Sequence, residues 1–312
     1  MGSTTLVIVN PASANGSTGK LWPRIAERLH GAGLSFEWEM TGGPGDATRL
    51  AREALLGGYE YIISVGGDGT LNEVANGFLD DDGPVNPCAV LGVLPRGTGC
   101  DFSRAVGIPK DLERAAACLM GGGVATIDAG KVRYVGHDGE VHTRYFVNVC
   151  DVGLGGDTVD RVNHTSKASG GFCSFLWGAV VSLLRYRNHE VSISIDGEEP
   201  FDASVTVLAM ANGRYFGGGM QIAPLADPAD GLLDVVLCRD FGKLEAIANL
   251  PRLYRGTHLA HPKVVHRRAR AVRVTSTERV LLDLDGEQPG VLETEASVVP
   301  AALNIRVPKR PW

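Results

Sequence analysis

The chain has 312 residues, of which 44% are hydrophobic and 21% are charged, and its formal net charge is −6 at pH 7. This composition is typical of a globular protein with one large domain or two medium ones, and the negative charge argues against a protein that binds nucleic acid through its overall charge. The six cysteines include no C-x-x-C pair, so neither a zinc site nor a disulfide framework is predicted. The longest apolar segment, 172–184, is too short to span a membrane, and residues 4–9 read as a first strand and not as a signal peptide. We therefore expect a cytoplasmic protein.

The first 128 residues alternate between short apolar runs, glycine-containing loops and segments with helical spacing. Strands are predicted at 6–9, 35–40, 61–65 and 89–94. Helices are predicted around 21–29, after the loop that ends at Ala47 and through Leu56, at 71–79 and at 112–120. This alternation predicts an α/β domain with a parallel sheet and right-handed crossovers. Ligands of such sheets bind beyond the carboxyl ends of the strands, so we expect the loops at the four strand ends to converge on one crevice.

The loop after the third strand, Gly66-Gly67-Asp68-Gly69-Thr70, carries the clearest chemical signal. We expect its glycines to adopt positive φ and to bring backbone N–H groups close to a ligand, while the helix from Leu71 adds unpaired donors at its N-terminus. Such a loop suits phosphate, and a carboxylate among phosphates requires Mg²⁺ between them. An ordinary glycine turn in which Asp68 caps the helix is the alternative.

A second glycine-containing segment, Gly16–Lys20, is similar to a phosphate-binding P-loop but does not match it. Ala14 stands at the position of the first glycine, and Leu21 stands at the position of Ser or Thr. Lys20 is therefore either a phosphate contact or a solvated lysine near the start of the following helix, in whose first turn Pro23 is tolerated.

Beyond Asp128 short strand-like runs replace the alternation, and turn signals such as Asp196-Gly197 and Asp285-Gly286 separate many of them. This pattern predicts an antiparallel sandwich or barrel-like domain, interrupted by helices at about 172–187 and 243–254. We therefore predict two domains, 1–128 and 129–312. The strand-like runs are 129–134, 143–149, 190–195, 203–209, 232–237, 271–275, 279–284 and 304–307.

Six segments occur in an order that is more specific than any one of them: NPASA at 10–14, TGGPGDA at 41–47, GGDGTLNEV at 66–74, LPRGTGCDFSR at 94–104, the stretch 211–237, and LDLDGEQPG at 282–290. Together they resemble the motifs of the diacylglycerol kinase catalytic domain family, the soluble bacterial lipid kinases that are also similar to sphingosine and ceramide kinases. NAD kinases also carry a GGDGT turn, so the ordered set is more specific than this turn alone.

The resemblance implies an N-terminal nucleotide-binding α/β domain with the NAD kinase/diacylglycerol kinase-like fold. It implies a C-terminal β-sandwich domain that binds lipid and metal, with the last segment packing back on the first domain. It also implies ATP as the phosphate donor, Mg²⁺ as the cofactor and a lipid hydroxyl, above all that of diacylglycerol, as the acceptor.

The resemblance assigns roles to individual residues. Glu287 matches the general base of the family and Asp68 the residue that organises the active-site Mg²⁺. A second, structural Mg²⁺ is implied at Asp230 and at the carbonyl groups of Asp227 and Leu232. The ATP-binding residues implied are Asn10, Pro11, Ala12, Ser13, Ala14, Thr41, Gly66, Gly67, Asp68, Gly69, Thr70, Leu71, Asn72 and Thr98.

Other interpretations of these residues stay open on the sequence alone. The Asp196-Gly197-Glu198 turn has the same Asp-Gly-Glu sequence as the turn at Glu287. Sequence spacing alone therefore does not decide whether Glu287 is a general base or a solvated carboxylate. The Asp-Pro and Asp-Gly pairs at 227–231 are also ordinary turns that need no metal.

Two positions depart from the family pattern. Cys100 stands where the family usually has Asn, and cysteine is a much poorer hydrogen-bonding residue. Ala14 stands where the family often has glycine. Asp101 either belongs to a metal–water network or caps a helix.

The acceptor site and the membrane contact have the weakest signals. The apolar residues of 172–184 form either a wall for a lipid or ordinary core. A basic tract either faces anionic headgroups or is a solvated surface, and its residues are Arg252, Arg255, His258, His261, Lys263, His266, Arg267, Arg268 and Arg270.

We therefore predict an ATP- and Mg²⁺-dependent lipid kinase that is peripheral to the inner face of the membrane and binds no nucleic acid. A homodimer is implied by the resemblance. The alternatives are a kinase of another lipid (a sphingoid base, ceramide or monoacylglycerol), an NAD kinase, and a non-catalytic nucleotide sensor.

Overall fold

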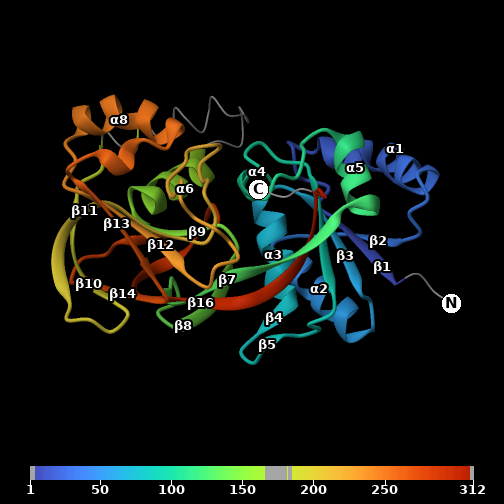
Figure 1. Cartoon of the computed structure of the whole chain (residues 1–312), viewed down its shortest axis with the longest axis horizontal. Helices are drawn as coiled ribbons and strands as arrows, with labels where there is room; N and C mark the ends of the chain where they lie inside the picture. Colours follow the sequence, from blue (N-terminus) through green and yellow to red (C-terminus); the bar gives the residue numbers. More distant parts are fainter. Residues whose placement is uncertain (1–3, 166–180, 182–184, 310–312) are drawn as a thin grey trace. The chain divides into compact units, whose positions relative to one another are not determined.

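The computed structural model describes residues 4–165, 181 and 185–309, and the chain forms two compact units (Figure 1). Unit 1 comprises Met1–Ile127 together with Ala301–Trp312, and unit 2 comprises Asp128–Pro300. Two strands, β7 (Gly123–Gly136) and β16 (Glu287–Val307), run from one unit into the other. The predicted helix at 172–187, with the apolar wall that it carries, lies outside the described residues except for 181 and 185–187.

Unit 1 is the predicted α/β domain. Its parallel strands lie in the order β2-β1-β3-β6, and the end of β16 extends the sheet by pairing in parallel with β6 through Asn304 and Ile305. The strands are β1 (Thr5–Val9), β2 (Glu37–Met40), β3 (Tyr61–Gly66) and β6 (Val90–Pro95), with a small hairpin of β4 (Leu79–Asp80) and β5 (Gly83–Pro84). The helices are α1 (Ser17–Gly31), α2 (Asp46–Leu56), α3 (Asp68–Phe78), α4 (Asp101–Ala105) and α5 (Leu112–Gly121).

The buried core of unit 1 explains why its strands and helices could be predicted from the sequence. Val7 of β1 and Ile63 of β3 are completely buried, as expected for strands covered on both faces. They pack with Trp22, Ile25 and Leu29, which recur at helical spacing on one side of α1. The predicted start of this helix is wrong, however: α1 begins at Ser17, so Pro23 lies in its second turn and not in its first.

Unit 2 is antiparallel, as predicted, and its strands close a ring. The pairings run β11-β10-β14-β16-β15-β9 and return to β11, while β12 and β13 extend the sheet from β11 and β7 and β8 extend it from β16. The ring encloses an apolar core that includes Ile193, Leu208 and Val272. The strands not yet given are β8 (Val141–Phe146), β9 (Val149–Gly153), β10 (His189–Ile195), β11 (Phe201–Ala211), β12 (Leu233–Arg239), β13 (Val264–Ala269), β14 (Ala271–Thr275) and β15 (Leu281–Leu284).

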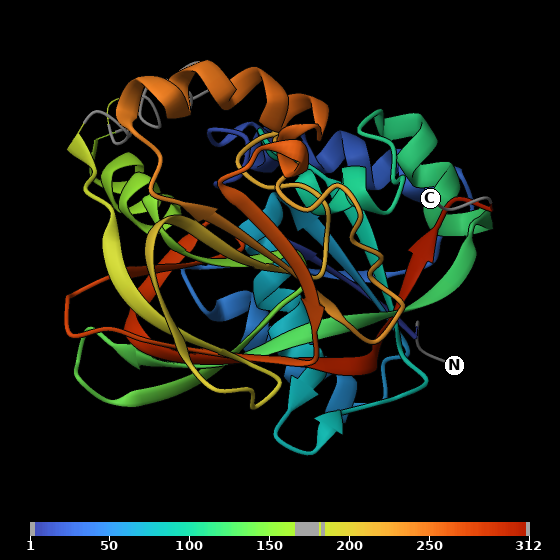
Figure 2. The ribbon, with the colours of Figure 1, turned by 60° about the vertical axis from the view of Figure 1, so that its left-hand side comes forward.

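The helices of unit 2 lie on the surface of this barrel (Figure 2). They are α6 (Leu154–Thr165), which follows β9 directly, and α8 (Lys243–Arg255), which is followed by the short 3₁₀ helix η1 (His258–Ala260). The sequence analysis predicted α8 but missed α6, β9 and β13. None of the helices in the described parts of the chain has the length and apolarity that crossing a bilayer requires.

Candidate active site

The loops at the strand ends of unit 1 touch one another around the N-terminus of α3. The side-chain amide of Asn10, after β1, donates to the Thr70 hydroxyl at 2.9 Å. The N–H of Phe102, after β6, donates to Oδ1 of Asp68 at 3.2 Å. The loops after β1, β3 and β6 are therefore brought together, as the topology predicts.

The loop after β2 is tied to the same helix by a residue to which the sequence analysis gave no role. The carboxylate of Glu73 on α3 accepts the N–H groups of Gly45 at 2.9 Å and Ala47 at 3.1 Å. These groups lie at the N-terminus of α2, where a negative charge is favourable. Thr41 sits at the start of this loop and donates its N–H to the carbonyl of Val9 at 2.9 Å.

The glycines of the central loop serve a different purpose from the one predicted. None of Gly66, Gly67 and Gly69 has positive φ, and α3 begins at Asp68 and not at Leu71, so both expectations are wrong. Glycine is needed here for space. A Cβ on Gly66 would lie 2.4 Å from Oγ1 of Thr70, and a Cβ on Gly97 would lie 2.6 Å from the Cα of Gly67. The glycines therefore let the loops after β3 and β6 lie backbone against backbone.

Two acidic side chains face one glycine in this region. A Cβ on Gly99 would lie 3.0 Å from Oδ2 of Asp68 and 3.4 Å from Oδ2 of Asp101, so both oxygens border a space that only glycine leaves open. Asp101 also forms an ion pair with Arg104. It is the first residue of α4 and does not cap that helix.

This arrangement fits Mg²⁺, which binds hard oxygen donors and commonly uses one or two carboxylates together with phosphate and water. In the parts of the chain that the structure describes, no group of three or more His, Cys, Asp or Glu residues is arranged to hold a metal ion. Phosphate and water would therefore supply the remaining ligands. Lys110, which the sequence analysis did not select, donates its ammonium to the carbonyl groups of Thr98 at 3.3 Å and Gly99 at 2.5 Å and adds a positive charge beside this loop.

The remaining residues predicted to bind ATP occupy two kinds of position. Leu71 and Asn72 are buried in α3, where the Asn72 carbonyl oxygen accepts from Asn76, so their side chains belong to the interior of unit 1. The loop after β1 is exposed to a greater extent and is held by local hydrogen bonds. In it the N–H of Ala12 bonds to Oδ1 of Asn10, the Ser13 hydroxyl bonds to Thr18, and the carbonyl of Pro11 accepts the N–H of Gly19.

Both departures from the family pattern fall on left-handed backbone. Ala14 has a φ of 50° and Cys100 a φ of 51°, a region that glycine and asparagine adopt more readily than other residues. This explains why Gly and Asn suit these positions. The Cys100 thiol is 2% exposed and donates to the carbonyl of Gly97 at 3.3 Å, and burial, reinforced by the charge of Asp68, raises its pKa.

In unit 2 the predicted base, Glu287, follows a turn that is fixed by Asp285. Asp285 has a φ of 49°, and its carboxylate accepts the N–H groups of Val147 at 2.8 Å, Asn148 at 3.0 Å and Val149 at 2.8 Å. The carboxylate of Glu287 is half-buried and pairs with Arg144 of β8 at 2.7 Å. Sequence spacing gave no signal for Arg144, because the pair joins residues that are 143 positions apart.

The turn with the same letters, Asp196-Gly197-Glu198, has a similar backbone. Asp196 has a φ of 50°, and its Oδ1 accepts the N–H groups of Arg270 and Ala271. Glu198, however, is exposed and forms a two-bond ion pair with Arg267 at 2.7 and 2.8 Å. The two turns therefore have a similar backbone, and the two glutamates differ in their surroundings: Glu287 is half-buried and Glu198 is exposed.

Beneath the Glu287 turn lies a pair of buried acids that the sequence analysis missed. Asp151 of β9 and Asp283 of β15 are direct cross-strand partners. Asp151 is completely buried, and burial raises its pKa to about 7. Burial and the charge of Asp151 raise the pKa of Asp283 well above its ordinary value. Two buried carboxyl groups that face each other do not readily both ionise, so the protonated form of at least one of them is favoured.

The loop predicted to hold a structural Mg²⁺ is already neutralised by protein groups. Oδ1 of Asp230 accepts the N–H of Leu232 at 3.0 Å, and the same carboxylate forms an ion pair with Arg268. Oδ1 of Asp227 accepts the N–H of Ala229 at 3.1 Å. A cation at Asp230 would have to displace the guanidinium, so Arg268 competes with a second Mg²⁺ for this carboxylate.

The basic tract is not a single surface. Lys263 pairs with Glu245, His266 with Asp234 and Arg267 with Glu198, while His258 is buried and bonds to the carbonyl of Ile222. Only Arg252 and Arg255 lie on α8, and neither forms an ion pair with any residue in the described parts of the chain.

Comparison with known proteins places this architecture among kinases. A family model described as "Diacylglycerol kinase catalytic domain" matches residues 4–132, and one described as "YegS C-terminal NAD kinase beta sandwich-like domain" matches residues 148–307. A diacylglycerol kinase of Bacillus subtilis (strain 168) is 30% identical over 304 residues, which cover 97% of this chain and 96% of that protein. A diacylglycerol kinase of Mycobacterium tuberculosis (strain ATCC 25618 / H37Rv) is 29% identical over 303 residues, which cover 97% and 94%.

Solved structures show the same fold at lower identity. A putative diacylglycerol kinase from Bacillus anthracis str. Sterne has a TM-score of 0.75 at 22% identity, with 97% of each chain covered. Yeast NADH kinase complexed with NADH has a TM-score of 0.58 at 12% identity, with 99% of this chain and 84% of that chain covered. The predicted fold class, an α/β domain with a parallel sheet and a β-rich antiparallel domain, is confirmed.

Proposed function

Because the chain belongs to the diacylglycerol kinase family and is a lipid kinase, we propose that it transfers the γ-phosphate of ATP to the hydroxyl of diacylglycerol to give phosphatidic acid. The observation that carries the proposal is the convergence of three strand-end loops on Asp68 at the N-terminus of α3. Backbone N–H groups at a helix N-terminus favour phosphate, and the space beside Gly99 is lined by two carboxylates.

The proposed chemistry gives each of the predicted site residues a separate role. Mg²⁺, when bound, neutralises charge on the phosphates. Asp68 and Asp101 hold its position, and Thr70 and the N–H groups of α3 hold the phosphates. Glu287 accepts the proton of the lipid hydroxyl as that oxygen bonds to the γ-phosphorus and the bond to the bridging oxygen of ADP breaks. Arg144 orients the Glu287 carboxylate.

The acceptor suggests where the enzyme works. Diacylglycerol keeps its acyl chains in the bilayer, so we propose that the protein acts at the inner face of the membrane as a peripheral protein. The homodimer implied by the resemblance stays a prediction. An NAD kinase is the second candidate, since the fold is shared with yeast NADH kinase.

The test measures transfer of labelled γ-phosphate from Mg-ATP to a panel of lipids in mixed micelles, with NAD included. Glu287→Gln removes the proton acceptor, and we expect it to lower the rate on the preferred lipid by about 10² to 10⁴-fold. The matched control is Glu198→Gln, which changes the glutamate of the similar turn in the same unit and should leave the rate unaltered.

Labelling of NAD alone would replace the proposal with the second candidate. Equal activity of Glu287→Gln and wild type on a lipid would support the lipid kinase function but would show that Glu287 is not the general base. ATP binding without transfer to any acceptor would indicate a nucleotide sensor.

A further inference from the structure

Helix α8 exposes an unusual face. None of its 13 residues is buried, and Leu244 is 82% exposed. Ala248, Pro251 and Arg255 are also exposed and follow Leu244 at helical spacing, so they lie with it along one side of the helix. We call this side, together with exposed Arg252, the outer face of α8. It contains no acidic residue.

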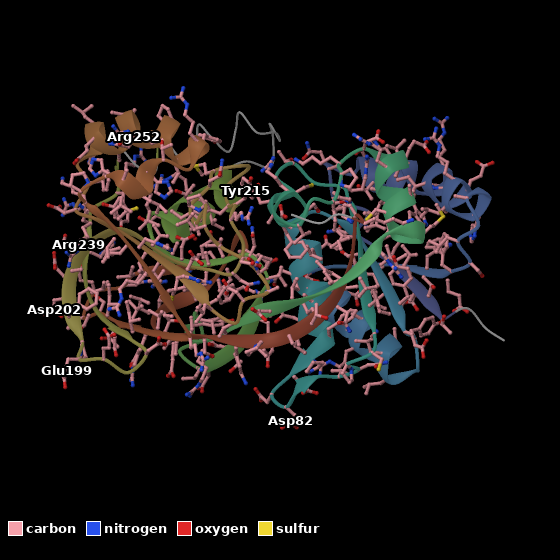
Figure 3. The ribbon with its side chains drawn as sticks, viewed as in Figure 1. Asp82, Glu199, Asp202, Tyr215, Arg239 and Arg252 are labelled. Atoms are coloured by element: carbon pink, nitrogen blue, oxygen red, sulfur yellow. The ribbon has the colours of Figure 1, made fainter. Side chains whose placement is uncertain are left out.

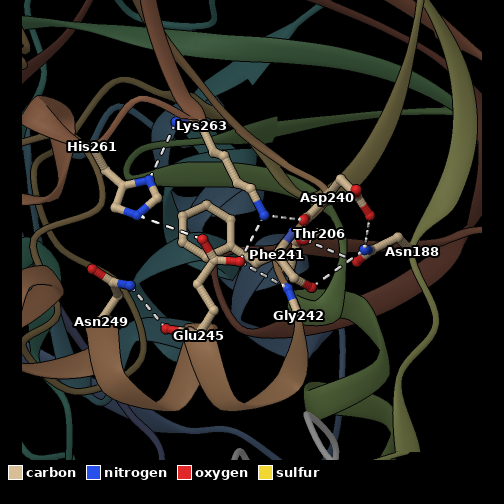
Figure 4. A network of polar contacts seen from close by, with 9 residues as sticks. All are labelled: Asn188, Thr206, Asp240, Phe241, Gly242, Glu245, Asn249, His261 and Lys263. Carbon is tan, nitrogen blue, oxygen red and sulfur yellow. Dashed lines mark hydrogen bonds and ion pairs between the residues drawn. The ribbon is translucent and has the colours of Figure 1, made fainter.

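Polar contacts at both ends and the packing of Leu253 against the core of unit 2 hold α8 in place, so the exposed residues of its outer face are not needed for that purpose. Figure 4 shows the network at its N-terminus: Glu245, the one acidic residue of the helix, pairs with Lys263 at 2.7 Å and accepts the N–H of Gly242 at 3.2 Å. Lys263 also donates to the carbonyl of Asp240 at 2.9 Å, and Asn188 donates to the Asp240 carboxylate at 2.9 Å.

The other end of α8 is anchored in the same way. The N–H and the side-chain amide of Gln221 donate to the carbonyl groups of Leu253 at 2.9 Å and Tyr254 at 3.0 Å. A Cβ on Gly256, the residue that caps the helix, would lie 2.9 Å from Pro224, so the loop after Gln221 packs beside this end. The next residue in that loop, Leu225, is 63% exposed and adds a second apolar side chain near the outer face.

The charge of this region is opposite to that of the whole protein. Arg252 and Arg255 form no ion pair within the described residues, whereas the chain carries a formal charge of −6. Figure 3 shows Arg252 at one end of unit 2 and the acidic residues Glu199 and Asp202 at the other. An apolar strip flanked by unpaired arginines is complementary to an anionic, partly apolar surface.

We propose that the outer face of α8, with Leu225, is the surface through which the protein binds an anionic lipid bilayer. Leu244 and Leu225 enter the boundary between headgroups and acyl chains, and Arg252 and Arg255 contact lipid phosphates. The inference deepens the proposed function, because a bilayer-bound acceptor needs an enzyme held at that surface, but the binding itself does not depend on phosphate transfer.

The test is cosedimentation of the full chain with large vesicles of phosphatidylcholine alone or of phosphatidylcholine and phosphatidylglycerol at 3:1, at low and at physiological salt. Each basic side chain near an anionic surface contributes a factor of roughly five to partitioning. We therefore expect Arg252→Gln/Arg255→Gln to bind the anionic vesicles about thirty-fold more weakly, and Leu244→Ser roughly ten-fold more weakly.

Matched controls change similar residues elsewhere. Arg133→Gln removes an exposed arginine of β7 in unit 2, and Leu56→Ser removes a leucine of unit 1 that is 73% exposed. Both should bind as wild type does. Circular dichroism and thermal unfolding establish that the variants are folded, since all five substituted residues are exposed.

Equal binding of wild type and the α8 variants, or equal binding to neutral and anionic vesicles, would overturn the proposal. Kinase activity of the α8 variants in non-ionic micelles should match wild type, because no anionic bilayer is present. If no lipid is phosphorylated in micelles while vesicle binding follows the expected pattern, the proposed function fails and the docking surface stands.

Discussion

The buried acid pair Asp151–Asp283 should make the stability of unit 2 fall as the pH rises. In the unfolded chain both groups ionise near their ordinary pKa values, whereas burial raises the pKa of Asp151 to about 7 and also raises that of Asp283 well above its ordinary value. The folded protein therefore binds protons that the unfolded chain has released. The free energy of unfolding is highest below about pH 4 for this pair and decreases through pH 7.

The magnitude follows from the pKa of Asp151 alone. A rise from 3.8 to about 7 is roughly three units, and each unit corresponds to about 1.4 kcal/mol, so the pair costs on the order of 4 kcal/mol above neutral pH. The perturbation we choose is Asp283→Asn. Oδ1 of Asp283 accepts the N–H of Gly286 at 2.9 Å, and an asparagine keeps that acceptor while its amide faces Asp151 as a permanent donor.

Urea unfolding at pH 5, 6, 7 and 8 should therefore show a steep decrease in the free energy of unfolding for wild type and a shallower one for Asp283→Asn. At pH 8 the variant should be the more stable by about 1 to 4 kcal/mol. Other groups that face the pair are Cys150, Asp285 and Tyr186, and they are present in both proteins, so the difference between the two curves isolates the pair. Parallel curves for wild type and variant would refute the raised pKa values of the pair.

Two further predictions concern charge and backbone strain. In the absence of nucleotide, Mg²⁺ should leave the thermal midpoint of wild type unaltered but raise that of Arg268→Gln, because the substitution frees the Asp230 carboxylate. A Mg²⁺ concentration of ten times the dissociation constant of this site would add about 1.4 kcal/mol to the free energy of unfolding. The control Arg267→Gln should behave as wild type does, and an equal rise in wild type would contradict the argument. Cys100→Asn should raise the free energy of unfolding by about 1 kcal/mol in urea, because asparagine adopts left-handed backbone more readily, and a loss of stability would show that the thiol contact with Gly97 outweighs the strain.

The fold of unit 1 was predictable because its signals are local. Strands such as β3 are short, mainly apolar and ended by glycine, and parallel order then places their loops at one edge. The structural reason for the glycines in such a loop was not predictable. Positive φ and the close approach of two backbones both require glycine, so the sequence does not distinguish them. The structure shows that close approach applies at Gly66 and Gly97.

The parts of unit 2 that were missed depend on partners far apart in the sequence. The strand β9 contains Asp151, which breaks the apolar pattern, and its partner Asp283 lies more than a hundred residues later. Arg144 meets Glu287 across a similar separation. The strand β16 runs for 21 residues and includes Pro289, Gly290 and Pro300, so only its last few residues had the alternation of a strand.

The position of Cys100 also bears on whether the fold is still catalytic. The sensor alternative drew its support from the loss of the family asparagine at this position. In the structure the thiol points to the carbonyl of Gly97, within its own loop, while Asp68 and Asp101 face the space beside Gly99. The left-handed backbone at this position costs a cysteine about 1 to 2 kcal/mol of strain, while both carboxylates assigned to the metal are still present. The departure at Cys100 therefore weakens the loop slightly and gives no reason to expect a kinase that has lost its activity.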